Sequence, residues 1–445
     1  MRCNHCSNAP CVTMCPVTAL YKRDDGIVDF DNERCIGCKS CTQACPYDAL
    51  YIDPISNTAA KCNYCSHRVD EGLLPACVVA CPEKAIIAGD LLNMNSEISQ
   101  LLFSQKTSVR KPEKGTGPNV FYIDAKATSL EPTSSSKQSY VWSSQDSGVG
   151  LNKNKTIEKF ENHIGKTKRT YDVPDKGIMW GNEVVGYLIT KAIAAGLIII
   201  LSTLTLFGIK FSLQEILTVS ILSFVFIALT GALLIKDLSQ PKRFLYIVFR
   251  PQFKSWLTRG TYIILSFGAI LLVLITCCLM GNENAANIIL EISLPIAILT
   301  AIYTAFLFAQ AKGRAFWNNK VSILFMLLHA IILGSILLSF ILTRNLQDEF
   351  HITEYLHFSS LLTTLILFKG NKIMESNLVS DVILKGQYKY HFWLLAIVVG
   401  NIIPVLLLII CPVSFIIPIA YLLLTIGIIT SNYLFIRVPQ LIPLS

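Results

Sequence analysis

The stretch CIGCKSCTQACP, residues 35–46, decides how the first part of this chain folds. Its C-x2-C-x2-C-x3-C-P spacing is typical of a loop and helix that bind a 4Fe-4S cluster, with the fourth thiolate crossing to a second cluster. Two other runs of four cysteines also end in Cys-Pro: Cys3, Cys6, Cys11 and Cys15 before Pro16, and Cys62, Cys65, Cys77 and Cys81 before Pro82. The sequence therefore predicts single-electron chemistry.

Two other kinds of cysteine site fit the pattern less well. Zinc ribbons use C-x2-C pairs, but as two separated pairs and without the closing proline. A disulfide scaffold belongs to secreted chains, and no signal peptide precedes Cys3 in this sequence. Iron–sulfur binding is thus the interpretation for the first two runs.

The ferredoxin rule assigns ligands to two complete clusters, because the last cysteine of each run serves the partner cluster. Cluster one would use Cys3, Cys6, Cys11 and Cys45, and cluster two would use Cys35, Cys38, Cys41 and Cys15. The third run, Cys62, Cys65, Cys77 and Cys81, has no run to exchange with and predicts incomplete sites.

An internal repeat accompanies the cysteines. Each Cys-Pro is followed by a strand-like phrase: VTALYKR at 17–23, YDALYID at 47–53 and EKAIIAG at 83–89. Their apolar residues suit short strands, and Gly26 and Pro54 mark turns between them. The fold expected for residues 1–123 is an α+β ferredoxin-like domain.

Residues 1–123 resemble the four-cluster electron-transfer subunit of the DMSO reductase and polysulfide reductase class. The resemblance rests on the three cysteine runs, for example KCNYCSHRVDEGLLPACVVACPEKAI at 61–86, and on RKPEKGTGPNVFYI at 110–123. It implies four cysteine runs, of which the first, absent here, exchanges cysteines with the run matching Cys62–Cys81. We therefore expect this sequence to begin inside a longer protein; a loss of clusters is the alternative.

The remainder of the chain is strongly apolar. The sequence is 52% hydrophobic and 15% charged with a mean hydropathy of +0.51, which indicates a membrane protein. Residues 124–180 are rich in serine and are predicted to form a flexible linker. Residues 181–438 are predicted to form an all-α membrane domain. Its eight apolar stretches, each long enough to span a bilayer, are 184–208, 213–236, 261–280, 287–310, 321–343, 353–369, 390–411 and 413–436.

The loops predict an orientation. An even number of spans puts both ends of the bundle on the iron–sulfur side. The same-side loops carry many lysines and arginines, whereas the opposite face has only Lys210 and Arg344. We expect the protein in the inner membrane of the cell. The positive-inside rule then places its iron–sulfur domain on the cytoplasmic side. A preceding twin-arginine signal would place it in the periplasm instead.

The membrane half is similar to the NrfD-type anchor family. The resemblance lies in YLITKAIAAG at 187–196, KDLSQPKRFLYIVFRPQFKSWLTRG at 236–260 and AIYTAFLFAQAKGRAFWN at 301–318. It implies an eight-helix bundle that exchanges electrons with quinone, such as menaquinone, and holds no haem. The histidines of this half, His329, His351, His357 and His391, form no obvious axial pair.

Four polar residues are candidates for a quinone site near the iron–sulfur side. They are Tyr187 and Lys191 in the first span, Asp237 at the end of the second and Tyr303 in the fourth. The resemblance implies a quinone-pocket tyrosine at Tyr303 and a polar pocket residue at Tyr187. Alternatively, Lys191 snorkels to the interface and the tyrosines belong to an aromatic belt. Arg243 and Trp256 are expected to contact the iron–sulfur domain or lipid headgroups.

These observations predict a non-catalytic electron-transfer and membrane-anchor subunit of a respiratory oxidoreductase. It would link the quinone pool to a separate catalytic subunit, of the molybdopterin type by resemblance. A nickel–iron hydrogenase or a multihaem cytochrome is the alternative partner, and no nucleic acid is expected. A membrane redox sensor or scaffold without quinone turnover, or a nonfunctional remnant, is the competing interpretation.

Overall fold

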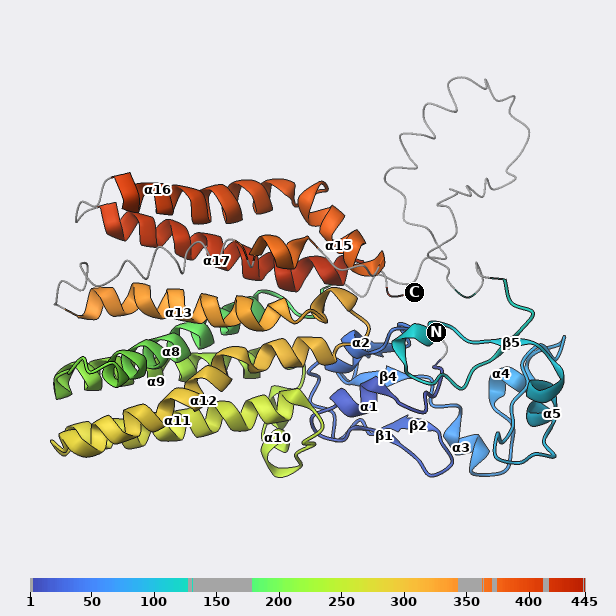
Figure 1. Ribbon diagram of the computed structural model, residues 1–445. Coiled ribbons are helices and arrows are strands. Elements are labelled where there is room, and N and C mark those ends of the chain that lie inside the picture. Colours follow the sequence, from blue (N-terminus) through green and yellow to red (C-terminus); the bar gives the residue numbers. More distant parts are fainter. Residues whose placement is uncertain are drawn as a thin grey trace, which may run out of the picture.

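The computed structural model describes residues 3–126, 130, 178–342, 362, 364–369, 374–410, 416–442 and 444. They form a small domain of short helices and hairpins, which packs against one end of a long helical bundle (Figure 1). Most of the segment 124–180 that was predicted to be a linker lies outside the described residues. The expected fold class, a ferredoxin-type domain followed by a helical membrane bundle, is confirmed.

The amino-terminal domain is built from very short elements. Its helices are α1 (Pro10–Met14), α2 (Ser40–Ala44), α3 (Ser66–Val69), α4 (Ala76–Val79) and α5 (Glu97–Ser104). Its strands are β1 (Leu20–Lys22), β2 (Val28–Phe30), β3 (Leu50–Ile52), β4 (Ala59–Lys61), β5 (Thr107–Ser108) and β6 (Tyr122–Ile123). Each consecutive pair of strands forms an antiparallel hairpin.

The first two repeats share one design. Cys15 directly follows α1 and Cys45 directly follows α2, and both cysteines take an extended backbone that starts the turn into β1 or β3. The two helices pack on each other. Gly26, at φ +85°, closes the β1–β2 turn, because a positive φ is accessible to glycine without strain.

The third repeat does not follow this design. Residues 83–89 were predicted to form a strand, and that prediction is wrong, because the structure assigns no strand there. The apolar residues are present, but no later strand among the described residues pairs with them, and β5 pairs with β6 instead. An isolated strand leaves its backbone groups without ladder partners, so the phrase remains irregular.

The bundle consists of long apolar helices. The candidate membrane spans are α8 (Asn182–Leu206), α9 (Leu213–Asp237), α11 (Trp256–Leu279), α12 (Glu283–Gln310), α13 (Val321–Ile341), a π-helical segment (His391–Ile402) that continues into α16 (Ile403–Ile410), and α17 (Ile416–Leu441). Shorter helices α10 (Tyr246–Phe249) and α15 (Met374–Leu384) lie near the small domain (Figure 1).

Seven helices among the described residues are thus long and apolar enough to cross a membrane. The predicted sixth span, 353–369, falls mostly on residues that the structure does not describe. Trp180, which was assigned to the linker, is 4% exposed and packs with the bundle. The contacts of the bundle therefore begin just before the predicted boundary at residue 181.

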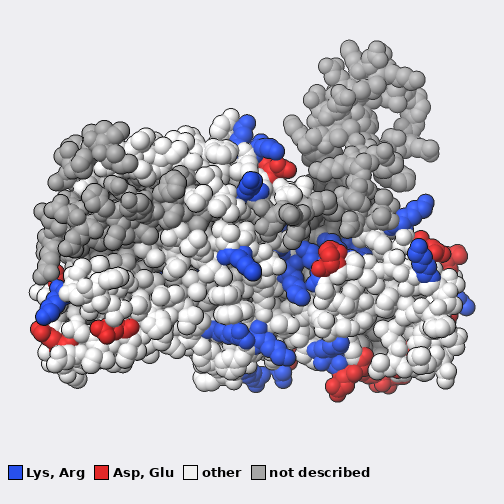
Figure 2. Space-filling model, in the orientation of Figure 1, with Lys and Arg blue, Asp and Glu red and all other residues white. Residues whose placement is uncertain are grey.

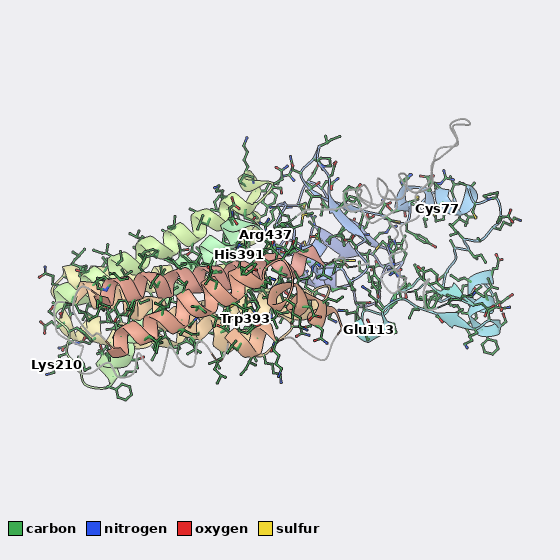
Figure 3. The ribbon with its side chains drawn as sticks, turned by 90° about the horizontal axis from the view of Figure 1, so that it is seen from above. Cys77, Glu113, Lys210, His391, Trp393 and Arg437 are labelled. Carbon is green, nitrogen blue, oxygen red and sulfur yellow. The ribbon has the colours of Figure 1, made fainter. Side chains whose placement is uncertain are left out.

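Charge is distributed as a membrane protein requires. Figure 2 shows a largely uncharged surface over the bundle, with lysine and arginine gathered where the bundle meets the small domain. Lys210 lies at the opposite end of the bundle (Figure 3). Because the lipid interior leaves charge unsolvated, this boundary marks one edge of the apolar zone.

Helix α8 lies at the centre of the bundle and contacts α9, α12 and α13. Its contact with α13 depends on two glycines. A Cβ built on Gly196 would lie 1.8 Å from the carbonyl oxygen of Ala330, and one on Gly334 would lie 2.3 Å from the carbonyl carbon of Gly196. Small residues let helix backbones approach closely in membranes.

Replacing Gly196 with alanine should therefore destabilise the bundle by about 1–3 kcal/mol, the usual cost of overpacking. The matched control is Gly268→Ala in α11, where a new Cβ meets no atom within 4 Å. Thermal unfolding in detergent would show a lower midpoint for Gly196→Ala alone. Equal midpoints for the two variants would contradict the glycine contact.

Candidate iron–sulfur centres and intramembrane polar cluster

The first set of cysteines lies at the centre of the small domain. Cys3, Cys6, Cys11 and Cys45 are each at most 8% exposed. Burial raises the pKa of the Cys11 thiol well above its ordinary value, and the nearby Cys45 and Cys3 raise it further. Burial likewise raises the pKa of Cys45 to about 11. The four thiols predicted for cluster one are therefore close together in a desolvated site.

The second set surrounds a single cavity. Cys15, Cys35, Cys38 and Cys41 all line it, together with Gly37 and other residues. Burial raises the pKa of Cys38 to about 12, with a further contribution from Cys15. The thiols predicted for cluster two thus converge on one cavity, although the ligand assignment itself stays a prediction.

This donor set suits 4Fe-4S clusters. A buried thiol resists ionisation, so a thiolate there requires a strong cationic partner such as iron. Backbone N–H groups of Leu20, Val17 and Ala19 reach Cys15 and partly offset the rise of its pKa that burial causes. Such N–H groups also stabilise cluster sulfur. The clusters would supply one-electron transfer when bound.

The third run of cysteines is much less enclosed. Cys77 is exposed, and Cys62, Cys65 and Cys81 are partly exposed. Figure 3 shows Cys77 at the end of the small domain that is remote from the bundle. Arg23 connects this region to the first repeat by a bidentate ion pair with Asp70, which lowers the pKa of that carboxyl group.

Lys191 is the centre of an intramembrane polar cluster, which we define as Tyr187, Lys191, Tyr303 and Thr304. The lysine is 1% exposed. Its Nζ donates to the carbonyl oxygen of Ala301 at 3.0 Å and to Thr304 Oγ1 at 2.5 Å. The same Nζ lies 4.7 Å from the ring centroid of Tyr303. Lys191 therefore points into the bundle, and the snorkelling alternative is wrong.

The two tyrosines of this cluster are also buried, at 3% and 4% exposure, and Tyr187 is within electrostatic range of Tyr303 and Asp237. A Cβ on Gly260 of α11 would lie 2.2 Å from the Tyr303 ring, so the ring fits here only because residue 260 has no side chain. Buried side chains of this kind are not an aromatic belt, because belt residues face the lipid interface.

Asp237, the fourth predicted residue, pairs with a lysine of the iron–sulfur domain. Lys39 Nζ donates to its carbonyl oxygen at 2.8 Å and lies 3.3 Å from Oδ1. Lys39 follows Cys38 in the iron–sulfur loop, so this ion pair joins the two domains. Nothing local in the sequence distinguishes Lys39 from the other lysines, so this ion pair was not predicted.

The expected docking residues behave differently from each other. Arg243 Nη1 donates to the carbonyl oxygens of Asn32 at 2.6 Å and Cys35 at 3.0 Å, as predicted for a contact with the iron–sulfur domain. Trp256 instead stacks on Phe306 of α12, with ring centroids 4.6 Å apart.

A hydrogen-bond network at the other side of the interface was not predicted. Gln440 Oε1 of α17 accepts from the backbone N–H groups of Met179 and Trp180, both at 3.0 Å, and from Gln43 Nε2 of α2 at 3.4 Å. Arg314 Nε donates to Gln43 Oε1 at 3.0 Å. These buried polar groups satisfy one another across the domains.

The fold and these sites define a membrane protein with an iron–sulfur domain on one end of its helical bundle. Residues 173–442 match the polysulphide reductase NrfD family model, which covers more than half of the sequence, and residues 1–91 match a 4Fe-4S dicluster domain. This protein belongs to the polysulphide reductase NrfD family.

Curated relatives resemble shorter stretches. A tetrathionate reductase subunit of Salmonella typhimurium is 46% identical over 142 residues, which are 32% of this chain and 57% of that protein. A polysulfide reductase subunit of Wolinella succinogenes is 41% identical over 130 residues, 29% of this chain and 68% of that protein. The arsenate respiratory reductase iron–sulfur subunit ArrB of a Shewanella species is 36% identical over 169 residues, 27% of this chain and 72% of that protein.

Two serine variants should separate the predicted ligand sets. Cys11→Ser should remove cluster one and Cys41→Ser cluster two, each lowering bound iron by about four atoms per protein. Iron analysis with EPR of the reduced protein measures this loss. Cys278→Ser, in membrane helix α11, is the control and should lose none. Loss of the same EPR signal in both variants would contradict the assignment.

Proposed function

We propose that this protein passes electrons between the membrane quinone pool and a separate catalytic subunit through 4Fe-4S clusters, and that it anchors the complex in the membrane. The observation that carries the proposal is the buried cluster of Lys191, Tyr187 and Tyr303, which lies in the same bundle that binds the iron–sulfur domain. Ionisable residues inside a membrane are costly and usually functional.

The side chains fit the chemistry of a quinol. Oxidation of a quinol releases two electrons and two protons, so a site needs donors and acceptors for two ring oxygens and a route for protons. In our proposal the Tyr303 hydroxyl and the Lys191 ammonium hold these oxygens. Thr304 connects Lys191 to Met326, since its hydroxyl donates to the Met326 sulfur at 3.0 Å.

Asp237 would have a second role in this scheme. It pairs with Lys39, and it is within electrostatic range of Tyr187. A carboxylate at this place can accept a proton from the quinol side while it holds the iron–sulfur loop. The proposed quinone site therefore keeps all four predicted residues, with Asp237 at its border.

The proposed partner is a catalytic subunit of the molybdopterin type. Support comes from the names of the relatives, which are subunits of tetrathionate, polysulfide and arsenate reductases. The third cysteine run is exposed and lies at the end of the domain that is remote from the bundle (Figure 3). We place the binding site of the partner subunit at this end.

Conservative variants test the quinone site. Tyr303→Phe and Asp237→Asn should slow the reduction of the clusters by quinol at least tenfold, a loss of about 1.4 kcal/mol or more of transition-state stabilisation, with cluster content unchanged. Stopped-flow optical spectroscopy measures this rate. Tyr262→Phe is the matched control, because its hydroxyl donates to Val248 at 2.9 Å outside the polar cluster.

Unchanged quinol kinetics in both variants would exclude the proposed site. If quinol failed to reduce the clusters of the unmodified protein as well, a redox sensor or scaffold would be the better description.

We also propose that the iron–sulfur domain faces the cytoplasm, in agreement with the basic residues at its junction with the bundle (Figure 2). Trypsin added to intact spheroplasts should then leave the domain uncut, whereas inverted vesicles should lose it. Immunoblotting with an antibody against residues 97–110 measures the result. Cleavage in intact spheroplasts would place the domain on the periplasmic side.

A further inference from the structure

The loop of residues 35–38 is held by the membrane domain through its backbone. Four successive carbonyl oxygens of this loop each accept a hydrogen bond from the membrane half of the chain. The pairs are Arg243 Nη1 with Cys35 at 3.0 Å, the backbone N–H of Gln240 with Ile36 at 3.2 Å, the backbone N–H of Ser239 with Gly37 at 3.1 Å, and Trp180 Nε1 with Cys38 at 3.2 Å.

This arrangement also fixes the direction of the peptide N–H groups. In a trans peptide the C=O and N–H bonds point in opposite directions, and the described residues contain no cis bond. Carbonyls turned towards the membrane domain therefore turn the N–H groups of residues 36–39 away from it. Residues 35–39 line the cavity that also contains Cys15 and Cys41.

The close contact depends on Gly37. Its φ is +67°, and a Cβ there would lie 2.6 Å from Ser239 Cβ and 3.1 Å from the backbone nitrogen of Gln240. Only glycine takes this conformation without strain and leaves room for the neighbouring segment. The CIGC loop is thus shaped to accept the residues that follow α9.

The corresponding loop of the first run is held differently. The carbonyl of Asn4 accepts from the backbone N–H of Asn119 at 2.9 Å, and that of His5 accepts from the Asn119 side chain at 2.8 Å. Asn119 belongs to the iron–sulfur domain itself. Two similar loops therefore have different supports, one inside the domain and one in the membrane bundle.

We infer that the membrane domain sets the reduction potential of the cluster at Cys15, Cys35, Cys38 and Cys41, with Trp180 and Arg243 as positioning residues. Hydrogen bonds from N–H groups to cluster sulfur stabilise the extra negative charge of the reduced state and so raise the potential. The loop between Cys3 and Cys6 would not tune the other cluster in this way, because the carbonyl oxygens of Asn4 and His5 accept from Asn119 of the iron–sulfur domain. The inference rests on the ligand sets of the proposed function.

Trp180 is well placed for this role. Its ring stacks on Trp317 with centroids 5.4 Å apart, and its backbone N–H donates to Gln440. The indole N–H is therefore held at a fixed point against Cys38. Removing that N–H frees the Cys38 carbonyl to rotate, and the N–H of the same peptide would rotate with it.

The test is a redox titration of the full-length protein in detergent, monitored by EPR. Trp180→Phe keeps an aromatic ring but removes the N–H, and should lower the midpoint potential of cluster two and leave cluster one unchanged. The signals are assigned with the Cys11→Ser and Cys41→Ser variants. Trp393→Phe is the matched control, because its indole N–H donates to the carbonyl oxygen of Leu384 at 3.1 Å within the bundle, and both potentials should persist.

Arg243→Gln is a second variant, on the more exposed side of the same loop, and should also lower the midpoint potential of cluster two. It replaces Trp180→Phe in the test if that variant reduces the yield of folded protein. Unchanged potentials, or equal shifts of both clusters, in the variant that folds would overturn the inference. Absence of a second cluster signal in the unmodified protein would instead overturn the ligand assignment of the proposed function.

Discussion

The exclusion of charge from the lipid interior is the constraint on which the rest of this structure depends. Every polar side chain that enters the bundle must find its partner inside the protein, because no water is available there. Lys191 meets this condition with two oxygen acceptors and an aromatic face. Where the apolar zone ends, lysine and arginine side chains gather beside the iron–sulfur domain (Figure 2).

That gathering makes the domain junction more than an attachment. The side chains of Lys39, Arg243 and Gln440 contact backbone or side-chain groups across it. The Lys39–Asp237 pair therefore joins a cluster loop to the end of α9, and Asp237 is itself one residue of the proposed quinone site. Electron transfer between membrane and cluster would be organised by the same contacts that hold the domains together.

The sequence predicted the parts of this structure that local pattern determines. Cysteine spacing indicated the iron–sulfur domain, and hydropathy indicated the spans, because both are read over short windows. Apart from the contact of Arg243, the interface was not predicted, since Lys39 and Asp237 are separated by 198 residues and Trp180 and Cys38 by 142. The strand predicted at 83–89 failed for a related reason: an apolar phrase becomes a strand only where a partner pairs with it.

The backbone contact between Gly196 and Gly334 has a mechanical consequence. It leaves α8 little freedom to slide or rotate against α13, so α8 acts as a stiff rod through the membrane. One end of the rod begins just after Trp180, and Lys191 lies about 14 Å further along it, at 1.5 Å per residue. The position of Lys191 is therefore fixed relative to Trp180 and, through the hydrogen bond of Trp180, relative to the loop around Cys38. Two glycines thus give the protein a rigid link between its interior and its metal sites.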